Sequence, residues 1–246
     1  MKRKNICFSL FVLGLIATVT ALLVWGVYSR LSRPPITQTL DPDRPMVALT
    51  FDDGPSPRYT PQILDILYQT QTPATFFLVG ERMEGGRLLI REMKTVGHQV
   101  ECHTYSHQNL SALTGEEIRQ EVALAQEELE KILPGHKFRY LRPPYGSYTQ
   151  KVEQEAGITL AMWTVDSRDS EPGQEDKIYS NVVDHIKDGD VVVLHDCPET
   201  ARVLESIILT LKEKGYQLVT LDQLAARLTQ EEKEALIIPS TWKGKS

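Results

Sequence analysis

The sequence predicts an α/β fold in which helices cover a parallel β-sheet, and three observations support this fold class. From residue 46 onward, short apolar runs of strand length alternate with longer amphipathic stretches of helix length. Seven such strand-then-helix units follow one another, the order typical of a parallel sheet. The composition, 41% hydrophobic and 24% charged residues, excludes a mainly disordered chain. The pattern alone leaves a (β/α) barrel and an open doubly wound sheet as alternatives.

The expected strands are short runs rich in apolar residues: Met46–Phe51, Ala74–Val79, Gln99–Cys102, Phe138–Leu141, Leu160–Val165, Val191–Leu194 and Gln217–Thr220. The stretches between them predict helices over 61–70, 85–96, 115–132, 148–156, 175–187, 199–214 and 222–229. Thr114, followed three residues later by Glu117, is a capping-box signature for the helix over 115–132. The ends of several helices are marked by Gly97, Gly157, Gly189 and Gly215.

The first residues of the chain predict a membrane segment. From Ile6 to Tyr28 the sequence runs for 23 residues without a charge or a proline, long enough to span a bilayer as a helix. Three cations at positions 2–4 precede this run, so the positive-inside rule keeps the N-terminus in the cytoplasm and places the remainder outside the cell. We expect residues 1–28 to be an uncleaved anchor. A cleaved signal peptide, with a weak cleavage signal at 19–21, is the first alternative, and a buried core helix is the second. In the first two interpretations the folded domain is exported.

The rest of the chain divides into three expected segments. Residues 29–45 are rich in proline and polar groups and predict a linker that holds the domain off the membrane. Residues 46–228 form the folded domain, and residues 229–246 a C-terminal tail.

The charge distribution excludes one class of partner. Residues 1–34 hold five of the 27 Lys and Arg and no carboxylate, so the remainder carries a net charge of −11. A body this acidic is poorly suited to bind nucleic acid through its phosphates. The three cysteines, Cys7, Cys102 and Cys197, are too few for a disulfide framework. The sequence carries no signal for an oligomeric state.

Polar residues gather where the expected strands end, and in both candidate folds ligand chemistry takes place at these ends. The first strand ends at Asp52-Asp53, the third at His103, the fourth at Arg142, the fifth at Asp166 and the sixth at His195. We therefore expect a site at the carboxyl edge of the sheet.

The spacing of these residues indicates a metal-assisted reaction. His103 and His107 are four apart, so on a helical turn both imidazoles could share a cation, with one carboxylate of Asp52-Asp53 as third ligand. The second carboxylate could then act as general base, and His195 is suited to be general acid. Taken alone, Asp-Asp-Gly-Pro is also a common turn, and His195 could simply bond to the backbone.

Taken together, the residues resemble a known family. Five motifs occur in order: Thr50-Phe51-Asp52-Asp53-Gly54-Pro55, His103-Thr-Tyr-Ser-His107, Arg142-Pro143-Pro144-Tyr145-Gly146, Asp166-Ser-Arg-Asp169 and Leu194-His195-Asp196. This set resembles the polysaccharide deacetylase family, the NodB-homology domain of carbohydrate esterase family 4, over about Met46 to Leu228. The resemblance implies a distorted (β/α) barrel with fewer than eight strands, preceded here by the transmembrane helix.

The resemblance also implies a role for each matching residue. Asp53, His103 and His107 match the metal ligands, with zinc the expected metal and cobalt, nickel or manganese as alternatives. Asp52 matches the catalytic base, and Arg142 the residue that holds its carboxylate.

The remaining matches concern the protonation of the leaving group and the stabilisation of the oxyanion. His195 matches the catalytic acid, and Asp169 the acidic residue that tunes it. Tyr145 matches the position whose backbone N–H stabilises the oxyanion.

Two positions depart from the family pattern. Ser170 stands where the family usually has a tryptophan that lines the substrate groove, and Trp163 is a candidate to supply that apolar wall. Cys102 stands where asparagine is common, and we interpret it as a buried thiol. A disulfide between Cys102 and Cys197 is the alternative in an exported protein.

These observations predict a metal-dependent hydrolase, anchored at the cell membrane, that removes N-acetyl groups from an extracellular amino-sugar polysaccharide and releases acetate. Peptidoglycan is the leading substrate, ahead of chitin-like or poly-N-acetylglucosamine chains. One alternative keeps the machinery but cleaves O-acetyl esters of a polysaccharide. Another is a non-catalytic carbohydrate-binding domain, which the intact base, ligands and acid argue against.

Overall fold

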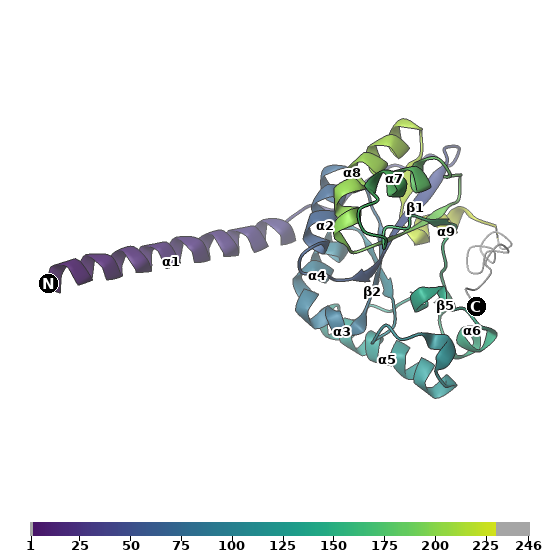
Figure 1. Cartoon of the computed structure of the whole chain (residues 1–246), viewed down its shortest axis with the longest axis horizontal. Coiled ribbons are helices and arrows are strands. Elements are labelled where there is room, and N and C mark those ends of the chain that lie inside the picture. The colour runs from purple at the N-terminus through teal and green to yellow at the C-terminus, as the bar shows by residue number, and fades with distance from the viewer. Residues whose placement is uncertain (1, 230–246) are drawn as a thin grey trace. The chain divides into compact units, whose positions relative to one another are not determined.

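The computed structural model describes residues 2–229, so all but the first residue of the expected tail lies outside the described residues. The chain divides into two compact units, Met1–Pro34 and Pro35–Ser246. The first contains the helix α1 (Lys2–Leu31), drawn in purple in Figure 1. Within α1, the segment Val12–Leu31 is long and apolar enough to cross a membrane, with a mean hydropathy of 1.9. Membrane anchorage by this helix stays a prediction.

The second unit is built on a curled parallel sheet (Figure 1). Its strands are β1 (Met46–Gly54), β2 (Thr75–Leu78), β3 (Gln99–Cys102), β4 (Tyr140–Leu141), β5 (Thr159–Leu160), β6 (Val165–Asp166), β7 (Val191–His195) and β8 (Gln217–Val219). They follow the order β5-β4-β3-β2-β1-β7-β6, and β8 pairs with the first residues of β1. The path ends at β5 and β6, which do not pair with each other among the described residues. The expected distorted barrel is confirmed.

The number of strands exceeds the expectation of fewer than eight, for a local reason. The run Leu160–Val165, predicted as one strand, is divided into β5 and β6. Between them, the backbone carbonyls of Ala161 and Met162 accept hydrogen bonds from the Arg142 guanidinium, at 3.0 and 2.9 Å. These carbonyls therefore accept hydrogen bonds from a side chain instead of from a neighbouring strand. The sheet consequently has eight strand segments.

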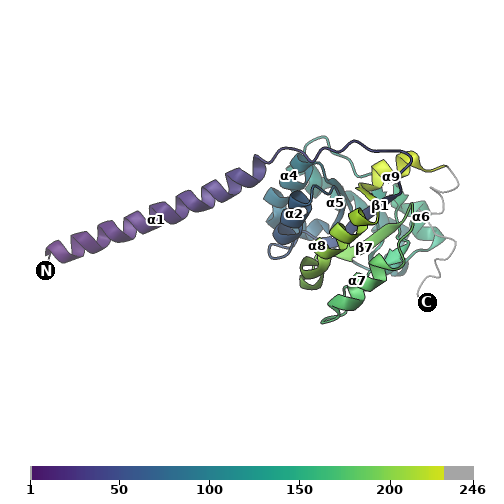
Figure 2. The ribbon, with the colours of Figure 1, turned by 90° about the horizontal axis from the view of Figure 1, so that it is seen from above.

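The helices that follow the strands are α2 (Thr60–Gln69), α3 (Gly80–Met83), α4 (Arg87–Val96), α5 (Gly115–Ile132), α6 (Gln150–Ala156), α7 (Glu175–Val183), α8 (Pro198–Glu213) and α9 (Leu221–Arg227). Single turns of 3-10 helix lie at Glu84–Gly86, Leu110–Ala112 and Pro144–Gly146. The capping box that begins α5 is present: Thr114 accepts a hydrogen bond from the Glu117 amide, and Glu117 accepts one from the Thr114 amide. Figure 2 shows α7 and α8 beside β7.

The central strand β1 is buried on both faces, and the alternation of its side chains separates two regions. Val47, Leu49 and Phe51 belong to the large core cluster together with residues of α2, α4, α5 and α8. Met46 and Ala48 point the other way and pack with residues of α9. Because alternate residues of a strand share a face, Asp52, near the carboxyl end of β1, lies on the same face as Met46 and Ala48.

Part of the expected linker packs on the folded domain. The Ile36 amide donates to the Val96 carbonyl at 2.9 Å, and the Gln38 side chain donates to the Leu218 carbonyl at 2.9 Å. Asp41 exchanges two hydrogen bonds with the Gln217 side chain. The compact unit accordingly starts at Pro35, whereas the sequence placed the start of the domain at Met46. We call residues 35–45 the strap.

Candidate active site

Two histidines and one aspartate lie together at the carboxyl end of the sheet. Asp53 is the penultimate residue of β1, where a backbone φ of 70° turns its side chain away from the alternation of the strand. His103 directly follows β3, and its amide continues the ladder by donating to the Leu78 carbonyl. His107 follows at the end of a short loop. Their ligand atoms all lie within 4.8 Å of one another.

The hydrogen bond of His103 decides which nitrogen faces the cluster. Its Nδ1 lies 2.7 Å from the Arg142 carbonyl oxygen, which can only accept, so Nδ1 carries a proton and, in the neutral imidazole, Nε2 carries the lone pair. That Nε2 lies 3.4 Å from Asp53 Oδ1, and His107 Nε2 lies 3.0 Å from the same oxygen.

These donors fit a divalent cation. Asp53 Oδ1 is buried and no hydrogen bond reaches it from the described residues. Lone pairs of one carboxylate and one imidazole that face each other repel unless a cation lies between them. Two histidines and one carboxylate are also a donor set that zinc accepts, with a further position open.

Asp52 is held by a buried arginine. Arg142 follows β4 and is fully buried, and its Nη1 donates to Asp52 Oδ1 at 2.8 Å and lies 2.6 Å from Thr50 Oγ1. The guanidinium also lies 4.1 Å from the centroid of the Phe77 ring. A buried charge of this kind needs a full set of partners, and Arg142 has one. The arrangement fixes one oxygen of Asp52, which lines the cavity described below.

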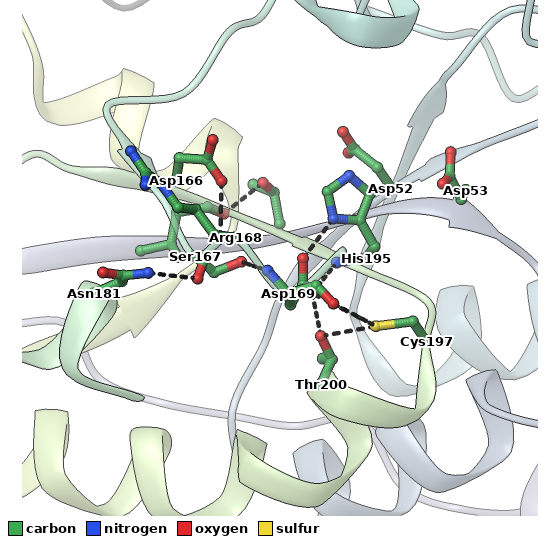
Figure 3. A network of polar contacts seen from close by, with 12 residues as sticks. Asp52, Asp53, Asp166, Ser167, Arg168, Asp169, Asn181, His195, Cys197 and Thr200 are labelled. Carbon is green, nitrogen blue, oxygen red and sulfur yellow. Dashed lines mark hydrogen bonds and ion pairs between the residues drawn. The ribbon is translucent and has the colours of Figure 1, made fainter. Parts of the chain in front are cut away.

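His195 forms the second ion pair of the site (Figure 3). It is the last residue of β7, and its Nδ1 lies 2.6 Å from Asp169 Oδ1. Burial disfavours the charged imidazole, but the hydrogen bond with Asp169 and the charges of Asp169, Asp52 and Asp53 raise the pKa of His195 to about 9. The other carboxylate oxygen of Asp169 accepts from the His195 amide and from the Thr200 hydroxyl. Asp52 and His195 are register partners in β1 and β7.

All eight predicted site residues except Arg142 and Asp169 line one cavity of about 370 Å³. Those two residues lie behind it, each in contact with a residue that does line it. Tyr145 stands at the rim, 66% exposed, with its backbone at a φ of 60° and its ring 5.0 Å from the His107 ring. Trp163 and Ser170 both line the cavity, so Trp163 does contribute to its wall.

The proposed disulfide does not form. Cys102 is buried in the core cluster of β3, and Cys197 lies at the N-terminus of α8, with Sγ 3.5 Å from Thr200 Oγ1. Both thiols are free. The interpretation of Cys102 as a buried thiol is confirmed, and burial raises the pKa of its thiol to about 12.

The sequence did not indicate the residues that hydrogen-bond to Arg142 and Asp169 and so help to orient the site. Thr50, beside Arg142, lay within a quoted motif but carried no role of its own. Thr200, which donates to Asp169, stands in the first turn of α8, and a threonine in a first turn is too common to indicate a role.

Parallel α/β barrels carry their catalytic residues at the carboxyl ends of the strands, and this chain groups its titratable residues there. It is therefore an enzyme of the α/β barrel class. A family model described as polysaccharide deacetylase matches residues 39–161, half of the chain. The chain belongs to the polysaccharide deacetylase family.

Three relatives show the range of this similarity. The chain is 38% identical to a chitooligosaccharide deacetylase of Bradyrhizobium over 197 residues, 72% of this chain and 90% of the relative. It is 37% identical to a peptidoglycan-N-acetylglucosamine deacetylase of Bacillus cereus, covering 72% and 67% of the two chains. The peptidoglycan-N-acetylmuramic acid deacetylase PdaC of Bacillus subtilis is 36% identical over 80% of this chain, which spans 42% of that relative. The solved structure of PdaC matches with a TM-score of 0.73, over 80% of this chain and 96% of that structure.

Proposed function

We propose that this chain is a metal-dependent N-deacetylase of an extracellular amino-sugar polysaccharide. One observation carries the proposal: the Asp53, His103 and His107 cluster, the buried carboxylate of Asp52 and a histidine paired with a buried aspartate lie around a single cavity. Asp53, His103 and His107 would hold the cation. When bound, the cation supplies Lewis acidity, which polarises the acetyl carbonyl and lowers the pKa of a neighbouring water.

Asp52 acts as the general base in this proposal. Its carboxylate lies beside the cluster and takes the proton from the attacking water. Arg142 holds Oδ1, so the acceptor atom of the base is fixed before substrate arrives. The hydroxide adds to the amide carbonyl carbon, and the backbone N–H of Tyr145 donates to the oxygen on which negative charge develops.

His195 completes the reaction as the general acid. Leaving-group nitrogen must be protonated before the C–N bond breaks, and a histidine with a pKa of about 9 carries the proton needed at neutral pH. Asp169 keeps Nδ1 occupied, so Nε2 is the atom that faces the cavity. The products are acetate and a free amino sugar.

Peptidoglycan is the substrate that we favour. Two of the three relatives above are named for deacetylation of peptidoglycan sugars, and the third for chitooligosaccharides. An α1 helix that anchors the chain, with its basic N-terminus in the cytoplasm, would hold the domain next to the cell wall. Chitin-like oligomers are the second candidate class.

Acetate release tests the proposal. The full chain in detergent would be incubated with peptidoglycan and with N-acetylglucosamine oligomers, before and after removal of metal by a chelator. We expect chelator-sensitive release that zinc restores, and a loss of at least about 100-fold in Asp52→Asn, the size expected for removal of a general base. Asp65→Asn on α2, at a position that does not line the cavity, is the control.

Two results would contradict this function. Release that survives complete metal removal would contradict metal dependence. A folded, zinc-loaded chain that releases acetate from O-acetyl esters and not from either N-acetylated substrate would favour the esterase.

A further inference from the structure

A carboxylate from a helix outside the cavity holds the loop between His103 and His107. Glu121 lies on α5 and is buried, with 7% of its surface exposed. Its Oε2 accepts hydrogen bonds from the backbone amides of Tyr105 and Ser106, at 3.0 and 2.8 Å. Its Oε1 accepts from the Ser106 hydroxyl at 2.7 Å. One side chain thus makes three hydrogen bonds to the middle of the loop.

The geometry of these bonds calls for an acceptor at this point. Two consecutive backbone N–H groups converge on one oxygen, an arrangement that forms a small anion-binding concavity. Without an acceptor, two partly buried donors would be left unpaired, and the loop would change its course to find water. Glu121 therefore selects the conformation in which both amides point toward α5.

The selected conformation is one that the chain would not adopt unaided. Thr104 and His107 have backbone φ values of 67° and 59°, a region that non-glycine residues rarely occupy. Such residues persist only where the surroundings over-determine them. The start of α3 supplies part of this restraint, because the amides of Gly80 and Glu81 donate to the carbonyls of Thr104 and Tyr105.

We propose that Glu121 is a positioning residue for the metal centre. By accepting hydrogen bonds from the amides of Tyr105 and Ser106, it stabilises the loop conformation in which the His103 and His107 side chains point toward Asp53. The inference rests on the proposed function, because it assumes that these three residues bind a cation. Groups that orient ligands from outside typically contribute about 10- to 100-fold to metal affinity.

Zinc affinity, and not activity, is the measurement that tests this role. The full chain, purified in detergent and stripped of metal, would compete for Zn²⁺ with a chromophoric chelator of known affinity. We expect Glu121→Ala to raise the Kd for Zn²⁺ at least about tenfold. Glu121→Gln should stay within about threefold of the unchanged chain. Its amide oxygen can accept from both backbone N–H groups, and its NH₂ can donate to the Ser106 hydroxyl. Glu127→Ala, at an exposed position of the same helix, is the matched control and should leave the Kd unchanged.

The outcomes separate this inference from the function on which it rests. An unchanged chain that does not bind Zn²⁺ would contradict the proposed function itself. An unchanged chain that binds, with a folded Glu121→Ala variant of equal affinity, would overturn only the role of Glu121. A loss in Glu121→Gln as large as in Glu121→Ala would also overturn it, because the hydrogen bonds would then not be what matters. Should Glu121→Ala fail to give a folded circular dichroism spectrum, Glu121→Asp replaces it. That variant keeps the charge but shortens the side chain by one methylene, which draws the carboxylate away from the two amides, and an unchanged Kd there would overturn the proposal.

Discussion

Arg142 serves two parts of the candidate site through different atoms. Its guanidinium donates to Asp52, while its backbone carbonyl accepts a hydrogen bond from His103 Nδ1. The carboxylate and one metal-type ligand are therefore oriented by the same residue. Because Arg142 is also fixed by the carbonyls of Ala161 and Met162, a lysine in its place could not satisfy these partners.

The pairing of Asp169 with His195 predicts a pH dependence. The pKa of His195 is raised to about 9, so an acid role persists up to that pH and is lost above it. In Asp169→Asn the neutral amide no longer stabilises the imidazolium, and the pKa should fall toward the ordinary value of about 6.5. We expect the alkaline limb of the pH profile of kcat/KM to move from near pH 9 to lower pH by one unit or more.

The control for this profile is Asp166→Asn, which changes a carboxylate that lines the cavity and accepts from the Arg168 amide; the described residues show no hydrogen bond or ion pair between it and His195. Its alkaline limb should coincide with that of the unchanged enzyme. An Asp169→Asn variant with the same limb would show that Asp169 does not set the protonation of the acid.

At the scale of elements, α3 and the loop 103–107 are packed so closely that only glycine fits between them. A Cβ added to Gly80 would lie 2.5 Å from Tyr105 Cδ2, 2.9 Å from the Tyr105 Cα and 3.3 Å from the Ala125 Cα. The Cα atoms of Tyr105 and Ala125 belong to the backbone and cannot move easily to make room for a Cβ. We expect Gly80→Ala to lower the free energy of unfolding by about 1–3 kcal/mol, measured by urea denaturation, despite the better helix propensity of alanine.

Gly85→Ala is the matched control, because a Cβ there meets nothing within 4 Å and the residue is exposed. It should leave the stability unchanged within about 0.5 kcal/mol. Equal stabilities of the two variants would refute the close approach at Gly80.

The elements that the sequence predicted best are those whose signals are local. The strand Gln99–Cys102 and the helix over 115–132 agree with β3 and α5 at both ends, because alternation, a capping box and an apolar stripe all lie within the segment. The run Leu160–Val165 was mispredicted as one strand. Its division depends on hydrogen bonds with Arg142, some 20 residues earlier in the chain, which no local pattern shows.

The same distinction applies to the site. Residues that line the cavity could be named from the sequence because the motifs carry rare combinations of Asp and His at strand ends. Glu121 and Thr200 could not be named, because a glutamate on an acidic helix and a threonine in a first turn are ordinary there. Only the folded chain shows what each of them contacts.

For the whole molecule, the strap decides where a stable domain begins. Besides the bonds of Ile36, Gln38 and Asp41, Arg44 donates to the Gly215 carbonyl, and the Gln217 amide donates to the Pro45 carbonyl. At roughly 1 kcal/mol for a net hydrogen bond, less the cost of ordering the segment, a chain cut to begin at Met46 should be less stable than one beginning at Pro35 by about 2–3 kcal/mol.

Urea denaturation of the two shortened chains measures this difference. Equal stabilities would mean that residues 35–45 act only as the spacer that their proline-rich, polar composition suggested. The sequence could not distinguish the two roles, because the partners of the strap, around Val96 and Gly215–Leu218, are far from it along the chain.

Three of the six non-glycine residues with positive φ among those described, Asp53, His107 and Tyr145, line the cavity. Each such conformation costs of order 1 kcal/mol or more, so the site is held against the preference of its own backbone. Substitution of these residues by glycine or asparagine, which tolerate positive φ, would relieve that cost but would remove the side chains on which the reaction depends. Selection for a durable fold and selection for turnover therefore pull these positions in opposite directions, and a lineage released from the second would lose the site before it lost the barrel.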